Sequence, residues 1–122
     1  MKDIYHITPE EVAERALMPY RLVETEEKMY EEMGRIMADC IEKNHGKQTV
    51  IILPVGPIGQ YKYLAKEINE RGLSLKNCYF INMDEYLDDS DRPIPKDDLL
   101  SFHGIMDRVF YSQIDPELIM PE

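Results

Sequence analysis

The sequence predicts an α/β domain in which a parallel sheet is flanked by helices and is truncated after two or three strands. Two short apolar segments, 49–53 and 78–82, alternate with segments whose apolar residues recur at helical spacing. This alternation favours parallel strands joined by right-handed crossovers. The 122 residues contain no internal repeat, linker or low-complexity tract, so 1–122 is interpreted as a single domain.

Two helices are expected before the first strand. Thr8-Pro9-Glu10-Glu11 has the form of a capping box with proline at the first helical position, and Pro19 should end this helix near Met18. A longer helix is predicted from about Val23 to Lys43. Its apolar stripe consists of Met33, Ile36, Met37, Cys40 and Ile41.

The first strand is predicted at Thr49–Leu53. Its unbroken, β-branched apolar character is typical of a strand that is buried on both faces, as in parallel sheets. A tight turn follows at Pro54–Gly59. The next helix directs Ile58 and the apolar residues after it inward, and it should end at Arg71-Gly72.

The second half of the chain repeats this pattern. Cys78–Asn82 is predicted to be the second strand, and an acidic loop separates it from an amphipathic helix at Leu99–Gln113. Asp115-Pro116 should break that helix. Leu118–Met120 has the character of an opening third strand.

Charge and composition exclude several classes of protein. Fourteen basic and 24 acidic residues give a net charge of −10, which argues against nucleic-acid binding. The absence of a long apolar run argues against a membrane span, and no signal peptide is apparent, so a cytoplasmic protein is expected. Cys40 and Cys78 form no CxxC pair, which argues against a structural zinc site.

Ligands of open parallel sheets bind beyond the carboxyl ends of the strands, and two loops lie there. The glycines of the first, Pro54–Gly59, would let the backbone approach an anion, although the same residues also suit a plain turn. The second loop begins with Asp84 and Glu85. A carboxylate at this position could act as a general base toward a ligand held by the first loop.

An alternative for the acidic loop is a metal site. Asp84, Glu85, Asp88 and Asp89 are oxygen ligands of the kind that Mg²⁺ and Ca²⁺ prefer. Their spacing does not match the EF-hand pattern. For Asp88, Asp89 and Asp91 a solvated loop is the favoured interpretation.

Several motifs together resemble the glucosamine-6-phosphate deaminase/isomerase family. They are NMDEY at 82–86, SFHGIM at 101–106, VFYSQIDPELI at 109–119 and ILPVGPIGQYKYL at 52–64. The resemblance extends over about 50–119. It implies a Rossmann-like fold and a reaction without metal or cofactor, in which an amino-sugar 6-phosphate ring opens, a proton leaves C2 and ammonia is released.

The resemblance also implies site residues. Asp84 matches the C2 base, and Glu85, Tyr86 and His103 would support it, with Glu85 orienting the loop. The substrate, a small sugar phosphate, would contact the first loop. The loop residues expected to bind it are Val55, Gly56, Ile58 and Gly59.

Two departures qualify these expectations. Pro54-Val55-Gly56-Pro57 is about two residues shorter than the family's loop and lacks its hydroxyl, and no Asp-x-His segment for ring opening occurs in the sequence. The chain is therefore expected to be an N-terminal portion with little turnover alone, which forms a homo-oligomer or pairs with a missing C-terminal half. A non-catalytic sugar-phosphate-binding module and a 6-phosphogluconolactonase-like activity are the alternative hypotheses.

Overall fold

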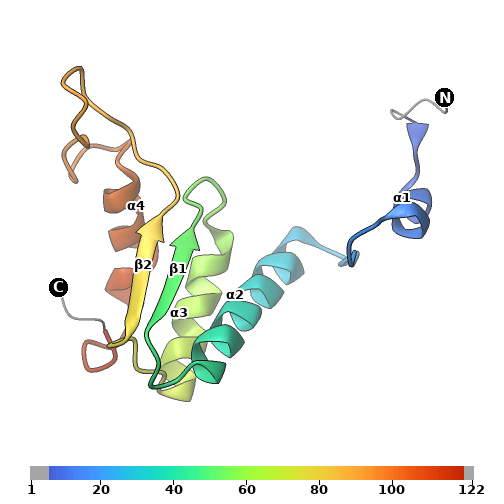
Figure 1. Cartoon of the computed structure of the whole chain (residues 1–122), viewed down its shortest axis with the longest axis horizontal. Coiled ribbons are helices and arrows are strands. Elements are labelled where there is room, and N and C mark those ends of the chain that lie inside the picture. The colour runs from blue at the N-terminus through green and yellow to red at the C-terminus, as the bar shows by residue number, and fades with distance from the viewer. Residues whose placement is uncertain (1–5, 120–122) are drawn as a thin grey trace.

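The computed structural model describes residues 6–119 as helices packed against a small parallel sheet (Figure 1). The elements in chain order are α1 (Pro9–Arg15), α2 (Glu26–Lys43), β1 (Thr49–Leu53), α3 (Gly59–Arg71), β2 (Cys78–Asn82), α4 (Phe102–Val109) and the 3₁₀ helix η2 (Tyr111–Gln113). Both strands have the predicted bounds. Among the described residues, no helix has the combination of length and apolar character that crossing a bilayer requires.

The two strands pair in parallel, as the sequence predicted. The register runs from Thr49 opposite Cys78 to Leu53 opposite Asn82, and α3 connects the two strands. Parallel strands need such a crossover, because a short hairpin can join only antiparallel ones.

The hydrophobic core lies between this sheet and the helices α3 and α4. Tyr61 is fully buried, and its hydroxyl donates a hydrogen bond to the carbonyl oxygen of Pro54 at 2.5 Å. The ring of Phe110 packs against Tyr61 and edge-on against Phe80, with ring centroids 5.6 Å apart in both pairs. The core therefore joins the start of the first loop to the end of α4.

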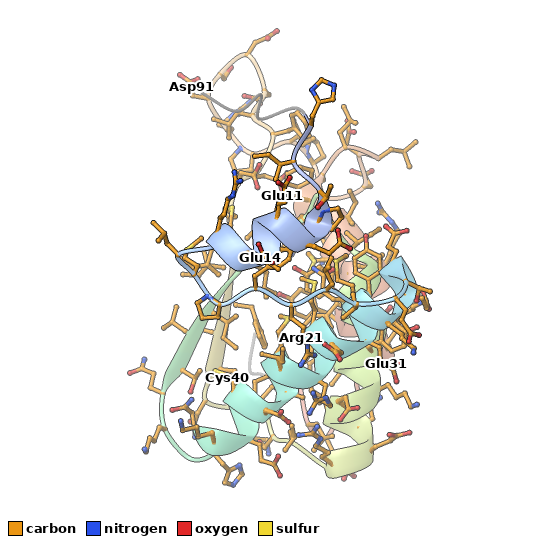
Figure 2. The ribbon with its side chains drawn as sticks, turned by 90° about the vertical axis from the view of Figure 1, so that its right-hand side faces the viewer. Glu11, Glu14, Arg21, Glu31, Cys40 and Asp91 are labelled. Atoms are coloured by element: carbon orange, nitrogen blue, oxygen red, sulfur yellow. The ribbon has the colours of Figure 1, made fainter. Side chains whose placement is uncertain are left out.

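The opposite face of the sheet is open, and the prediction of strands buried on both faces is wrong for this structure. Val50, Ile52, Tyr79 and Ile81 are each 52 to 60% exposed. The strands lie on one side of the molecule and α2 and α3 on the other (Figure 2). Only one face of the sheet receives helices from the described residues.

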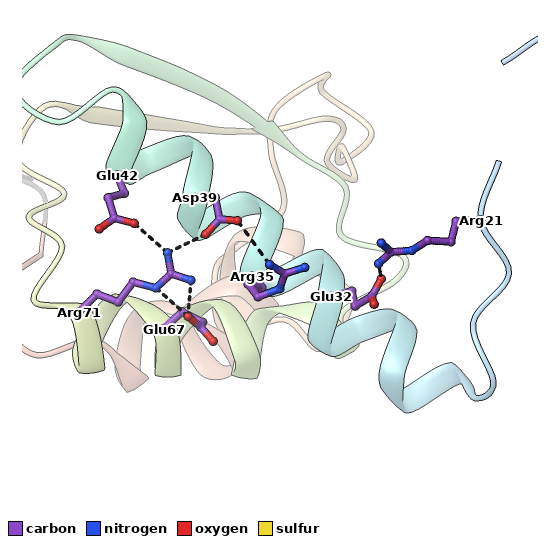
Figure 3. A network of polar contacts seen from close by, with 7 residues as sticks. All are labelled: Arg21, Glu32, Arg35, Asp39, Glu42, Glu67 and Arg71. Carbon is purple, nitrogen blue, oxygen red and sulfur yellow. Dashed lines mark hydrogen bonds and ion pairs between the residues drawn. The ribbon is translucent and has the colours of Figure 1, made fainter. Parts of the chain in front are cut away.

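The helices α2 and α3 cross closely and are joined by ion pairs. A Cβ atom built on Gly34 would lie 2.6 Å from Cβ of Tyr63, so only glycine fits at this crossing without a shift. Near the other end, the Arg71 guanidinium contacts carboxylates of both helices at 2.6 to 2.9 Å (Figure 3). Its partners are Asp39, Glu42 and Glu67.

The N-terminal helices are shorter than predicted. The capping box at Thr8 and Glu11 is present, but α1 ends at Arg15 rather than near Met18. This helix buries no residue, so no packing holds a further turn. The helix α2 begins at Glu26 rather than near Val23, because the side chain of Thr25 caps it.

The C-terminal predictions also need correction. The predicted helix Leu99–Gln113 is only Phe102–Val109, followed by the separate turn of η2. Leu118 lies in a turn, not in a strand, and its carbonyl oxygen accepts a hydrogen bond from the Leu75 N–H at 2.8 Å. Met120 lies outside the described residues.

The close crossing at Gly34 gives a stability prediction. Gly34→Val should lower the free energy of unfolding by about 1–3 kcal/mol, because the new side chain meets the backbone of α3. Urea titration followed by circular dichroism would measure this loss. Glu31→Val places the same side chain at an exposed position of α2 and should change stability by less than about 1 kcal/mol. Equal losses in the two variants would contradict the assigned crossing.

Candidate functional site

The carboxyl ends of the two strands bring the two candidate loops together. The last ladder contact is a hydrogen bond of 2.9 Å from the Met83 N–H to the Leu53 carbonyl oxygen. Pro54 and Asp84 are the residues that follow this contact on the two strands of the ladder. The glycine loop and the acidic loop therefore start side by side, where an open parallel sheet places its ligand.

Asp84 stands at this shared edge and is exposed. A cavity of about 360 Å³ opens between β2, the acidic loop and the start of α4. Its walls are formed by Phe80, Asn82, Glu85, Pro93, His103 and Tyr111. Two of the predicted supporting residues, Glu85 and His103, thus face one cavity.

Tyr111 gives this cavity a polar wall that the sequence analysis did not identify. Burial, followed by the neighbouring Tyr61, raises the pKa of the Tyr111 phenol to about 12. The hydroxyl is therefore protonated near neutral pH and can donate a hydrogen bond to a ligand. The sequence did not indicate this role, because Tyr111 packs against Phe80 and Phe110 as an aromatic core residue would.

Glu85 connects the acidic loop to the N-terminus of α4. Its carboxylate accepts the N–H groups of Phe102 and His103 at 2.9 Å each, and the Ser101 hydroxyl at 3.4 Å. Burial would raise its pKa, but the N–H donors of His103, Phe102 and Tyr86 and the Ser101 hydroxyl lower the pKa below its ordinary value. A carboxylate at a helix N-terminus is also stabilised by the helix dipole.

Tyr86 and Asp88 shape the rest of the acidic loop. The Tyr86 ring packs edge-on against Phe102, with centroids 5.2 Å apart. Asp88, predicted to be merely solvated, accepts the N–H groups of Ser90 at 2.8 Å and Arg92 at 3.1 Å. It also pairs with the Arg92 guanidinium at 3.0 Å and so closes the loop.

These contacts do not support the alternative of a metal site. The carboxylates of Glu85 and Asp88 are held by different donors in different parts of the loop. Within residues 6–119, no three acidic, histidine or cysteine side chains come together as a metal cluster.

The first loop contains glycines for two different reasons. A Cβ atom on Gly59 would lie 2.4 Å from the Tyr30 ring, so this glycine is required by packing between α2 and α3. Gly56 has open space around it. The side chain of Val55 is buried, and Ile58 is the N-cap of α3 without a side-chain hydrogen bond. Among the four predicted binding residues, Gly56 thus has the freest approach to a ligand.

Two cations near this loop were missed by the sequence analysis. Lys62 and Arg108 line a second cavity, of about 310 Å³, together with Ile58 and Gly59 at the start of α3. Lys62 also pairs with Glu27 at 2.8 Å. The position of Lys62 one turn into the helix was a signal available in the sequence. The position of Arg108 depends on how α4 packs and could not be read from it.

The comparisons with known proteins point to one enzyme family. No family model matches the chain. A glucosamine-6-phosphate deaminase from Parabacteroides distasonis is 42% identical over 79 residues, which cover 62% of this chain and 26% of that protein. One from Borrelia garinii subsp. bavariensis is 38% identical over 71 residues, which cover 57% and 25%. The chain is a partial relative of glucosamine-6-phosphate deaminase.

A solved structure supports the same relationship. A monomeric glucosamine-6-phosphate deaminase of the NagB superfamily superposes with a TM-score of 0.67 at 27% identity, over 86% of this chain and 43% of that one. The predicted family resemblance and α/β fold are thereby confirmed as a partial, NagB-like match. The chain spans about a quarter of the length of the curated glucosamine-6-phosphate deaminases it matches.

The Glu85 cap gives a prediction with a defined pH dependence. Glu85→Gln should lower the free energy of unfolding by about 1 kcal/mol at neutral pH, because α4 loses a charged cap. The folded-state pKa of Glu85 is lowered, so its stabilisation is complete above the ordinary carboxyl pKa and is lost as pH falls through the lowered value. Urea titrations of both proteins across acidic pH would show the two stabilities converging.

Asp89→Asn is the matched control, since it neutralises an exposed carboxylate of the same loop. Its stability should follow that of the wild type at every pH. A Glu85→Gln variant that differs from the wild type equally at all pH values would contradict the cap.

Proposed function

We propose that this chain carries one side of the catalytic site of a glucosamine-6-phosphate deaminase-like protein, with Asp84 as the base that removes the C2 proton. The observation that supports this proposal is that the adjacent acids Asp84 and Glu85 differ in their contacts and exposure. Glu85 has its oxygens engaged by N–H donors of α4 and a lowered pKa, both of which make it a poor base. Asp84 stands exposed at the shared edge of the two loops.

The proposed chemistry takes place on the open-chain sugar. The Asp84 carboxylate would accept the C2 proton, and the electron pair of the C2–H bond would form a C1–C2 double bond as the C1 carbonyl oxygen gains a proton. Return of a proton to C1 leaves an imine at C2. Water adds to this imine and ammonia leaves, which yields the ketose phosphate. A positioned base contributes typically 10²–10⁴-fold to such a proton transfer.

The phosphate group needs local positive charge, because the net charge of −10 repels an anion at long range. Lys62 and Arg108 supply that charge beside the start of α3, where helix N–H groups also favour an anion. These two cations would bind the phosphate in place of the hydroxyl that the shortened loop lacks. We therefore assign the phosphate contact to these two cations and the backbone of Gly56.

A non-catalytic sugar-phosphate-binding module is the second candidate. The first loop favours it, because Gly59 is required by packing against the Tyr30 ring rather than by a ligand, and because the loop contains no hydroxyl side chain. Such a module would bind the same ligand without moving its proton.

A proton-exchange experiment tests the proposed base. Glucosamine 6-phosphate deuterated at C2 should lose its label slowly in ordinary water when the chain is present, even if little ammonia is released. Asp84→Asn should lower the rate of label loss by at least about a hundredfold, because the base is absent. Nuclear magnetic resonance follows the label, and Asp89→Asn should exchange it at the wild-type rate.

The outcomes separate the two candidates. Label loss that persists in Asp84→Asn would contradict the assigned base. A ligand-dependent rise in melting temperature without label loss in the wild type would favour the binding module, since a ligand that binds only the native state stabilises it. Arg108→Gln should weaken that rise in either case.

A further inference from the structure

The first loop, Pro54–Gly59, has two of its carbonyl groups held by buried side chains of α3. The loop joins β1 to α3 at the carboxyl end of the strand (Figure 1). The Tyr61 hydroxyl donates a hydrogen bond to the Pro54 carbonyl oxygen at 2.5 Å. The Gln60 side-chain amide donates one to the Pro57 carbonyl oxygen at 2.7 Å. Tyr61 is fully buried and Gln60 is 1% exposed, so both carbonyl groups point toward the interior.

The same contacts fix the direction of two N–H groups. The peptide bonds of this loop are trans, and the C=O and N–H bonds of a planar trans peptide group point in opposite directions. The N–H of Val55 therefore points away from the interior, opposite to the Pro54 carbonyl. The N–H of Ile58 is opposite to the Pro57 carbonyl in the same way. Within residues 6–119 neither N–H has a hydrogen-bond partner, so both are donors that a ligand can use.

The stability of the fold does not by itself explain a glutamine at position 60. The Oε1 atom of Gln60 is buried and has no hydrogen-bond partner among the described residues. A buried acceptor without a donor destabilises the folded chain, and an apolar side chain of similar length would fill the space without this penalty. The benefit of Gln60 therefore lies in the loop peptide group that its amide orients.

We propose that Gln60 and Tyr61 are positioning residues, which turn the first loop so that the N–H groups of Ile58 and Val55 bind an anionic phosphate group. This inference rests on the proposed function, and it adds to that function the two side chains that prepare the loop for its ligand. Neither side chain contacts the phosphate, because each acts through the carbonyl group that it holds.

The surroundings of the loop suit a phosphate group. Gly56 lies between the two N–H groups in the sequence and has open space around it. Ile58 lines the cavity of about 310 Å³ that also contains Lys62 and Arg108. The positive end of the α3 dipole lies at the same place. Oxygens of one phosphate group can therefore accept N–H donors of the loop while the cations balance its charge.

Phosphate titration of the isotope-labelled chain, followed by nuclear magnetic resonance, tests the proposal. In the wild type, inorganic phosphate should shift the amide resonances of Val55 and Ile58 until they saturate. Gln60→Met removes the donor to Pro57 and keeps the length of the side chain. It should raise the dissociation constant for phosphate by at least about fivefold, because one N–H donor is no longer directed at the anion. At saturation, the shift of Ile58 should fall more than that of Val55.

Tyr61→Phe is the second variant, and it acts on the other peptide group. It keeps the ring in the core and removes the hydroxyl that holds the Pro54 carbonyl. The dissociation constant should again rise by at least about fivefold, for the same reason. The saturated shift of Val55 should now fall more than that of Ile58.

Gln48→Met and Tyr79→Phe are the matched controls, because both residues are exposed and lie outside the loop. Both should bind phosphate with wild-type affinity. Circular dichroism would compare the melting temperatures. Gln60→Met should melt at or above the wild-type temperature, because it removes the unpaired Oε1 atom and leaves the carbonyl of Pro57, an exposed residue, to bind water. If Gln60→Met does not fold, Tyr61→Phe decides the question.

These results are independent of the test of the catalytic base, because phosphate binding is measured without any proton transfer. Loss of affinity in the two variants supports the positioning role even if no label leaves C2, and such a result would contradict only the assigned base. Three outcomes would overturn the positioning role, whatever Asp84→Asn shows. They are wild-type affinity in both variants, equal falls at both amides, and loop resonances of the wild type that do not respond to phosphate.

Discussion

The parallel pairing of β1 with β2 is the constraint on which the candidate site depends. Its final hydrogen bond, from Met83 to Leu53, fixes the point at which both strands end. A slip of one residue would turn every side chain to the other face and would separate the two loops. The register is fixed because Leu53 is fully buried and because the Tyr61 hydroxyl donates a hydrogen bond to the carbonyl oxygen of Pro54. The packing of the core therefore positions the polar edge.

The same edge shows how two adjacent carboxylates acquire different properties. Glu85 is directed to the start of α4, where three donors from the 101–103 segment surround it. These contacts join the acidic loop and the start of α4 into one unit. Asp84 takes its position from this unit while its own carboxylate stays exposed. The two adjacent acids therefore differ in what they can do, because only the Asp84 carboxylate is free of the donors at the start of α4.

Local sequence signals predicted the two strands of the sheet well, but not the helix ends or the expected third strand at Leu118, which lies in a turn. Thr49–Leu53 and Cys78–Asn82 are short apolar runs bounded by polar and turn residues, so their limits were readable. The start of α4 has a local N-cap, Ser101, whose hydroxyl accepts the Gly104 N–H, and the sequence analysis overlooked it. The second part of the cap comes from Glu85, which lies 17 residues before Phe102 and has no local signal. Long-range packing also explains Gly59, whose contact with the Tyr30 ring has no local sequence signal. The contacts of Glu85 and Gly59 join distant segments and could not be predicted from local sequence.

The error about the sheet faces has a different origin. The residues at positions 50, 52, 79 and 81 are apolar, which is typical of strands that are buried on both faces. What the sequence pattern does not specify is which element covers each face. The described helices cover one, and the exposed apolar side chains before α2, those of Leu17, Met18, Tyr20 and Leu22, lie outside the core formed by the described residues. An exposed apolar face costs free energy in water, so a chain of this composition gains stability from whatever segment covers it.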